Sequence, residues 1–327
     1  MDQDLVLLFG LPRSGTTWIG KIFDSSPVTL YRHEPDSHQR LSLPLFAPAE
    51  DPAAAAALAR YATDIGAMTD GSVAGKLPLF PKQYLVPGQL GLYRGNVYAA
   101  KAAGRLGVAL PLWFAPGARA ARKAVVVWKS IESVGRSGLA LRALPRARLV
   151  LILRHPCAYA ASVMRGDSQQ RFRDRTPASE DYGLFEQLVA TPTARRYGLD
   201  LDRLRVLSPW ERLAWRWVVY NEKAWDEIAE EPRARLLRYE ALCADPFGVT
   251  RDLFNFAGID YGPQTEAFLR LSTGGRDGGY YSVYRDPGVA AWRWREEMAA
   301  ADQAAVMAIA RNSRVGAVYF DGSEETG

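Results

Sequence analysis

Five short segments of the chain have the pattern of buried strands. The segments 5–9, 125–128 and 149–153 are continuous apolar runs, and 28–31 and 236–240 are shorter or more mixed. Apolar runs of this length without alternation are typical of strands that are covered on both faces of a parallel sheet.

Helical spacing of apolar residues separates these strands. Segments with this spacing begin at Gly15, at Pro156 and at Pro209, and two others cover 48–66 and 245–258. Strands that alternate with helices predict an α/β fold, here a central parallel sheet of about five strands flanked by helices. The first strand is expected to lead into a P-loop-like turn.

Two long stretches depart from this alternation. Residues 78–117 are rich in Gly, Pro and aromatic residues and show no clear period, whereas 166–208 is charged and irregular. We expect both to be loop-rich or partly helical insertions, the first as a substrate wall or a packing layer, the second as a lid that orders on binding. No repeat or second core is evident, so 1–327 is expected to form a single domain.

Composition narrows the class of protein. A hydrophobic content of 48% and a charged content of 24% are those of an ordinary soluble protein. The net charge of +5 suits an anionic ligand, but no Lys/Arg block indicates nucleic acid. Cys157 and Cys243 form neither a disulfide framework nor a metal motif, which favours a reducing compartment. Because signal-peptide features and bilayer-spanning runs are both missing, we expect a cytoplasmic protein with no membrane span.

The turn after the first strand has the features of an anion-binding loop. The spacing from Gly10 to Gly15 matches the opening of a nucleotide P-loop, but Thr16 stands where that motif has its lysine. The cation is inside the loop instead, as Arg13, and a second hydroxyl follows at Thr17. Backbone N–H groups and a helix start suit a phosphate, and the missing lysine indicates a ligand other than ATP with Mg²⁺.

Polar residues follow three other strands, and ligands of open α/β sheets bind at the carboxyl ends of strands. The candidates there are His33, Glu34 and His38 after the second strand, Lys129 and Glu132 after the third, and Arg154 after the fourth.

The string Leu-Pro-Arg-Ser-Gly-Thr-Thr-Trp at 11–18 closely resembles the 5′-phosphosulfate loop of sulfotransferases that use 3′-phosphoadenosine-5′-phosphosulfate (PAPS). The resemblance implies a cofactor-binding role for Arg13, Ser14, Gly15, Thr16, Thr17 and Trp18. A strand followed by Arg-x-Pro, with Ser eight residues after the Arg, is similar to the family's second signature. It implies that Arg154 and Ser162 hold the 3′-phosphate.

Two further segments resemble sequence elements of the same family, but fewer of their residues match. Tyr-Glu-x-Leu at 239–242 resembles the element whose tyrosine contacts adenine, which implies that role for Tyr239. Arg285, seven residues before Trp292, resembles a tail that closes over the 3′-phosphate. Trp294 could equally be the matching tryptophan, and Arg285 would then have no assigned role.

The chemistry requires a cation near the bridging oxygen of the phosphosulfate and a base for the acceptor's proton. The resemblance implies Arg13 and Lys129 as the cations. The family's Lys-Thr-His string reads Lys129-Ser130-Ile131 here, so the base must be another residue. Glu34 is the candidate, because carbohydrate sulfotransferases place a glutamate just after the second strand.

His33, His38 and Glu132 are the alternative bases. Alternation along an extended segment predicts that His33 and Glu34 lie on opposite faces, so that only one of them points into the site.

The resemblance identifies a bacterial-type, metal-independent sulfotransferase. It would move a sulfuryl group from PAPS to a hydroxyl, less readily an amine, of a small-molecule, carbohydrate or lipid acceptor, leaving 3′-phosphoadenosine 5′-phosphate (PAP). A P-loop kinase is the first rival, opposed by Thr16 and by the lack of a strand that ends in Asp. A non-catalytic phosphonucleotide-binding protein is the second. The acceptor and the oligomeric state stay open.

Overall fold

The core of the protein is a five-stranded sheet in which all four strand pairs are parallel, in the order β2-β3-β1-β4-β5. The computed structural model describes residues 4–168, 176–274 and 287–321. The strands are β1 (Leu5–Gly10), β2 (Thr29–His33), β3 (Val125–Ser130), β4 (Ala147–Leu153) and β5 (Ala234–Arg238). The predicted α/β fold with a parallel sheet is therefore confirmed.

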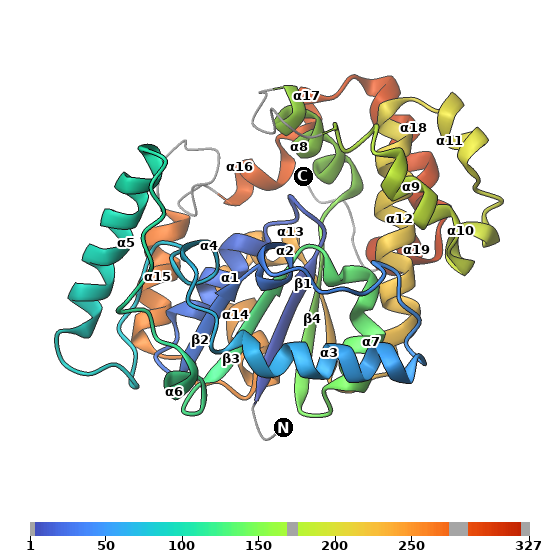
Figure 1. The fold of residues 1–327 in the computed structure, drawn as a ribbon. Coiled ribbons are helices and arrows are strands. Elements are labelled where there is room, and N and C mark those ends of the chain that lie inside the picture. Colours follow the sequence, from blue (N-terminus) through green and yellow to red (C-terminus); the bar gives the residue numbers. More distant parts are fainter. Residues whose placement is uncertain (1–3, 169–175, 275–286, 322–327) are drawn as a thin grey trace.

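Helices fill the connections between these strands (Figure 1). Those before β3 are α1 (Thr16–Ser25), α2 (Pro35–His38), α3 (Pro52–Ile65), α4 (Gly71–Ala74), α5 (Gln89–Arg105) and α6 (Ala118–Ala121). A 3₁₀ turn, η1 (Ser133–Arg136), and α7 (Ser137–Ala143) precede β4. Between β4 and β5 come α8 (Pro156–Ser168), α9 (Tyr182–Val189), α10 (Pro192–Arg196), α11 (Leu201–Val206) and α12 (Pro209–Ile228). The chain then forms α13 (Tyr239–Ala244), α14 (Pro246–Ala257), α15 (Pro263–Thr273), α16 (Pro287–Trp292), α17 (Trp294–Glu297), α18 (Ala300–Arg311) and α19 (Arg314–Phe320).

Side chains of the strands alternate between two hydrophobic cores, one on each face of the sheet. Leu5, Leu7 and Phe9 of β1 pack in the core with α3, α7, α8, α12 and α18. Val6 and Leu8 pack on the other face with α1, α13, α14 and α15. The continuous apolar runs of the sequence thus reflect strands that are buried on both sides.

The two insertions contain more regular structure than their composition indicates. Within 78–117 lies the 17-residue helix α5, and the described part of 166–208 contains the end of α8 and all of α9, α10 and α11. Only Tyr93, Asn96 and Val97 of α5 are buried, so the hydrophobic period of this helix is too weak to be seen in the sequence. Residues 169–175 of the predicted lid lie outside the described residues.

The topology places a binding site above β1. The connection that leaves β1 leads toward β2 at one end of the sheet, and the connection that leaves β4 leads toward β5 at the other. Adjacent strands whose connections diverge leave a crevice at their carboxyl ends, which is the common ligand site of such sheets. None of the helices in the described ranges is long and apolar enough to cross a bilayer.

Candidate active site

The loop that joins β1 to α1 is a tight turn with two left-handed residues. Arg13 has φ 73° and Gly15 has φ 79°, and the Ser14 N–H donates to the Leu11 carbonyl at 3.1 Å. A Cβ on Gly15 would lie 2.2 Å from the ring of Tyr239, so this position requires glycine for both its φ and its space. Successive turn residues of this kind aim N–H groups at one point, as anion sites do.

Helix α1 begins at Thr16, and the Trp18 N–H in its first turn donates to the Gly15 carbonyl at 3.0 Å. No side chain in the described ranges caps it, and its first turn has no acidic residue. The positive end of the helix is therefore not neutralised by the protein. Trp18 anchors the turn, because its Nε1 donates to Ser272 Oγ at 3.0 Å and its ring meets that of Tyr239 edge-on at 6.1 Å.

Arg154, directly after β4, connects this loop to the rest of the site. Its Nη1 donates to the Arg13 carbonyl at 2.7 Å, and its guanidinium lies 5.0 Å from the ring centre of Tyr239. The Nε of Arg154 is buried and has no hydrogen-bond partner within the described parts of the chain. Arg13 Nε donates to Ser162 Oγ at 3.1 Å. The structure thus brings Arg154 and Tyr239 together at this loop, and Ser162 reaches it through Arg13.

The C-terminal segment also reaches Arg154, although Arg285 itself lies outside the described residues. The Ala290 carbonyl in α16 accepts from Arg154 Nη2 at 2.7 Å. Trp294 stacks on His155 with ring centres 4.4 Å apart and planes at 12°, while Trp292 meets that ring edge-on at 6.3 Å.

Two supporting residues were not singled out from the sequence. Burial lowers the pKa of His155 to about 3, so this ring is neutral where it stacks on Trp294. The Glu240 carboxylate accepts a hydrogen bond from the backbone N–H of His155 at 3.0 Å and another from the Tyr319 hydroxyl at 2.7 Å. Together they hold the turn after β4. The only sign of this role in the sequence was that His155 follows Arg154 and Glu240 follows Tyr239.

Lys129, Glu34 and His33 form a second cluster at the ends of β2 and β3. His33 and Lys129 are direct neighbours in the β2–β3 ladder, and the Glu34 N–H donates to the Lys129 carbonyl at 2.8 Å. The Glu34 carboxylate is ion-paired with the buried Lys129 Nζ and lies 3.6 Å from His33 Nε2. The prediction that His33 and Glu34 lie on opposite faces is wrong, because Glu34 adopts φ 48° and ends the strand alternation.

The surroundings of His33 suit a residue that orients Glu34 better than one that accepts a proton. Its Nδ1 lies 2.8 Å from the Tyr31 hydroxyl, and burial raises the pKa of Tyr31 well above its ordinary value. Tyr31 therefore stays protonated, and when its hydroxyl donates a hydrogen bond to Nδ1 the imidazole proton is on Nε2, on the side of Glu34. Burial and then the charge of Lys129 push the pKa of His33 well below its usual range, so it is a weak base.

The other two alternative bases lie apart from this cluster. His38 is exposed at the end of α2. Glu132 has Asp36 and Ser37 as neighbours, and burial, followed by the charge of Asp36, raises the pKa of Glu132. Asp36 is itself buried and accepts from Ser133 Oγ at 2.6 Å. Among the four candidates, only His33 and Glu34 lie next to Lys129.

A buried lysine fixes the segment after α4 to α1. Lys21 Nζ donates to Asp24 Oδ2 at 2.6 Å, to the Lys76 carbonyl at 2.6 Å and to the Pro78 carbonyl at 3.0 Å. Lys76 is thereby held near the second cluster, where burial and then the charge of Lys129 lower the pKa of Lys76. The sequence analysis did not predict that Lys76 lies near this cluster, because its position depends on a contact with a helix that is distant in the sequence.

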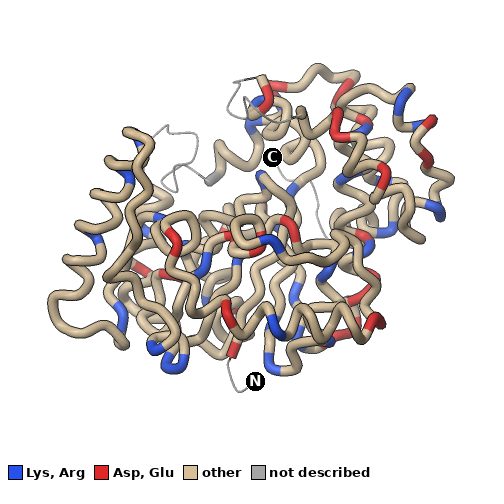
Figure 2. The backbone as a smooth tube through the Cα atoms, viewed as in Figure 1, with Lys and Arg blue, Asp and Glu red and all other residues tan. Residues whose placement is uncertain are grey.

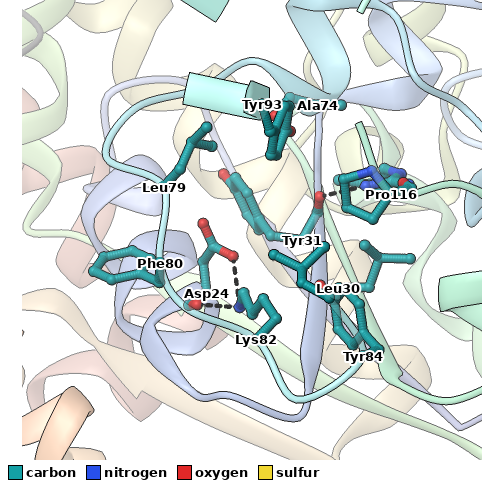
Figure 3. Close-up of a pocket in the computed structure, with 12 residues that line it drawn as sticks. Asp24, Leu30, Tyr31, Ala74, Leu79, Phe80, Lys82, Tyr84, Tyr93 and Pro116 are labelled. Atoms are coloured by element: carbon teal, nitrogen blue, oxygen red, sulfur yellow. Dashed lines mark hydrogen bonds and ion pairs between the residues drawn. The ribbon is translucent and has the colours of Figure 1, made fainter. Parts of the chain in front are cut away.

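The same network continues along β2. Lys82 is ion-paired with Asp24 at 3.0 Å, and Figure 3 shows this pair beside Tyr31 in a small pocket that Leu79 and Tyr93 also line. The pocket lies between β2 and the 78–117 insertion, so this insertion packs directly against the strand that carries His33. In the described ranges, no three His, Cys, Asp or Glu side chains are grouped as metal ligands.

Among solved structures, the chain is similar to the sulfotransferase domain of the Synechococcus PCC 7002 olefin synthase, with 16% identity over 94% of this chain and 95% of that one and a TM-score of 0.45. It is similar to a Mycobacterium avium sulfotransferase, with 16% identity over 98% of this chain and 77% of that one and a TM-score of 0.46. It is also similar to a mouse sulfotransferase complexed with PAP, with 14% identity over 99% of this chain and 90% of that one and a TM-score of 0.43.

A search of curated proteins gave no match. A sequence model described as "Sulfotransferase family" matches residues 6–263, which include the loop after β1, the Lys129 cluster, Arg154 and Tyr239. The match covers most of the chain, and so this protein belongs to the sulfotransferase family.

Proposed function

We propose that this protein transfers a sulfuryl group from PAPS to a hydroxyl of a small-molecule, carbohydrate or lipid acceptor. The observation that carries the proposal is the convergence of Arg13, Arg154, Ser162 and Tyr239 around the turn at the start of α1. These residues come from three separate parts of the chain, and packing alone does not require two arginines to meet there.

The residues present fit PAPS. The uncapped start of α1, with Ser14, Thr16 and Thr17, offers donors for the 5′-phosphosulfate. Arg154, whose buried Nε has no partner in the described residues, and Ser162 offer donors for the 3′-phosphate. Tyr239 gives a flat ring surface for adenine. When bound, PAPS supplies the sulfuryl group and its leaving group, PAP.

Sulfuryl transfer breaks the bond between sulfur and the bridging phosphate oxygen and forms a bond between sulfur and the acceptor oxygen. As in phosphoryl transfer, the protein's part is mainly to position groups and neutralise charge. Glu34 takes the proton of the acceptor hydroxyl, and His33 Nε2 lies 3.6 Å from its carboxylate. Lys129 and Arg13 stabilise the negative charge that grows on the bridging oxygen.

The two rival functions lack a supporting feature. A P-loop kinase needs a lysine after Gly15, where this chain has Thr16. A binding protein without catalysis has no need for the buried Lys129–Glu34 pair at the carboxyl edge of the sheet, which is costly to bury.

The first prediction concerns the ligand. PAP should raise the melting temperature with EDTA present, because arginines and N–H groups hold both phosphates without a metal. At a PAP concentration of 100 times Kd the stabilisation should reach about 2.7 kcal/mol. Thermal shift with PAP, adenosine 5′-monophosphate and ATP–Mg²⁺ measures this, followed by transfer from labelled PAPS to an acceptor panel. Preference for ATP–Mg²⁺ would favour the kinase, and PAP binding without any transfer would favour the binding protein.

The second prediction concerns Arg154. Arg154→Ala should weaken PAP binding by about 1.5–3 kcal/mol, because it removes a charged hydrogen-bond donor from the 3′-phosphate. Binding of adenosine 5′-monophosphate, which lacks that phosphate, should weaken less, because this ligand loses only the support that Arg154 gives to the Arg13 carbonyl and Tyr239, and calorimetry with both ligands separates the two effects. Arg148→Ala, at the other end of β4, is the matched control and should leave both affinities unchanged. An equal loss for both ligands would contradict the assignment of the 3′-phosphate to Arg154.

A further inference from the structure

The insertion that contains α5 exposes a concentration of large apolar side chains. Leu92, Tyr98, Leu106, Val108 and Trp113 are between 51 and 82% exposed, and all lie on α5 or the segment that follows it. Helix α5 stands at the outer edge of the molecule on the side of β2 (Figure 1). Single exposed apolar residues are ordinary, but a concentration within one segment indicates a partner.

The residues of α5 divide into three rows around its axis. At about 100° per residue, the buried residues Tyr93 and Val97 share the inner side. Leu92 and Ala99 lie seven positions apart and share the outer side, and the exposed Leu106 follows directly after the end of the helix. The outer side is thus apolar although it faces solvent.

The third row of α5 is cationic. Arg94, Lys101 and Arg105 follow each other by seven and four residues and line one border of the apolar row. The guanidinium of Arg94 donates to the Leu79 carbonyl at 2.7 Å, whereas Lys101 and Arg105 are exposed. An apolar stripe bordered by cations is the pattern of helices that lie on anionic membranes.

The charge of the surrounding chain strengthens this pattern. Between Asp70 and Glu132 the sequence has no Asp or Glu, and Figure 2 shows Lys and Arg but no acidic residue on α5. Lys82 and Lys129 in that interval are ion-paired inside the protein, and the exposed cations are Arg94, Lys101, Arg105, Arg119, Arg122 and Lys123. A second copy of this chain that docked through the same surface would present the same cations and be repelled, which favours an anionic occupant.

We propose that α5 and residues 106–114 form a docking surface for anionic lipid membranes. Trp113, Tyr98 and the leucines would enter the interface between headgroups and acyl chains, and Lys101 and Arg105 would contact lipid phosphates. Docking does not depend on the transfer reaction. It favours the lipid class among the acceptors left open, an extension that rests on the proposed function.

Vesicle flotation of the full chain tests the docking surface without using activity. The protein should float with phosphatidylcholine vesicles that contain about one-third phosphatidylglycerol, less so with added salt, and not with pure phosphatidylcholine. Leu106→Ser with Trp113→Ser, and separately Lys101→Gln with Arg105→Gln, should each lower the partition coefficient about tenfold or more. Val206→Ser with Arg205→Gln on α11 is the matched control, because Val206 is 83% exposed and lies outside the docking surface.

Unchanged stabilisation by PAP would show that all variants fold. The proposal is overturned if anionic vesicles do not bind the protein, if pure phosphatidylcholine binds it equally, or if the control variant loses as much binding. It is also overturned if light scattering shows a dimer that the α5 variants dissociate, because the surface would then join two copies. A lack of transfer activity alongside intact vesicle binding would count against the proposed function and leave the docking surface supported.

Discussion

Glu34→Gln should lower the turnover number by roughly 10²-fold or more and leave PAP affinity nearly unchanged. The amide keeps the size of the side chain but cannot take the acceptor's proton. Its position is set by the left-handed turn at φ 48°, by Lys129 and by His33. Steady-state rates with a chosen acceptor, together with PAP titration, measure the two quantities.

The nature of the acceptor provides an internal control for this variant. An acidic phenol that is already ionised has no proton to give up, so the loss caused by Glu34→Gln should shrink for it. The variant also leaves the buried Lys129 without its carboxylate, which costs stability, so each rate must be measured below the melting temperature of that variant. Near-normal turnover in Glu34→Gln, with loss of turnover in His38→Ala or Glu132→Gln, would place the base at that other residue.

His33 should behave differently from Glu34. His33→Gln retains an N–H donor that can reach Glu34, so it should keep more activity than His33→Ala. Burial and the charge of Lys129 hold the pKa of His33 well below its ordinary value, so the ring is neutral at physiological pH. If His33 were the base, both substitutions would abolish turnover equally.

The sequence predicted those features that depend on local spacing. The strands, the loop from Gly10 to Gly15 and the start of α12 at Pro209 follow from patterns within a few residues. Arg154 and Ser162 could be linked to that loop only through the family resemblance, because no local pattern shows which strand is the neighbour of β1. The parallel register of β1 with β4 supplies that proximity.

Other features depend on backbone conformation and tertiary contact, and the sequence did not show them. Strand alternation predicted that the side chains of His33 and Glu34 point to opposite faces. The left-handed conformation of Glu34 at the end of the strand instead puts them on the same side. Lys76 comes near Lys129 through tertiary contacts, among them the hydrogen bond from Lys21 of α1 to the Lys76 carbonyl. The position of helix α5 within the partly helical insertion could not be predicted, because its outer side is apolar and glycine-containing and no contrast between two faces marks its period.

Arg13→Ala should lower the turnover number by about 10²–10³-fold and weaken PAP binding by less than about tenfold. The expected difference arises because charge on the bridging oxygen grows in the transition state, whereas the N–H groups of the loop still hold the bound phosphate. Alanine is a better replacement than glycine here. Arg13 has φ 73°, and alanine has the same Cβ cost in that conformation, so only the side chain changes.

Two companion variants separate charge from position. Arg13→Lys keeps the cation and should retain much of the activity, although lysine cannot reproduce the fixed guanidinium geometry. Ser162→Ala removes the 3.1 Å contact with Arg13 Nε and leaves the charge in place, so it should reduce turnover less than Arg13→Ala. A rise in KM at constant turnover for Arg13→Ala would show that Arg13 only anchors the ground state. Catalytic charge stabilisation would then fall to Lys129, which is buried at the end of β3 beside Glu34.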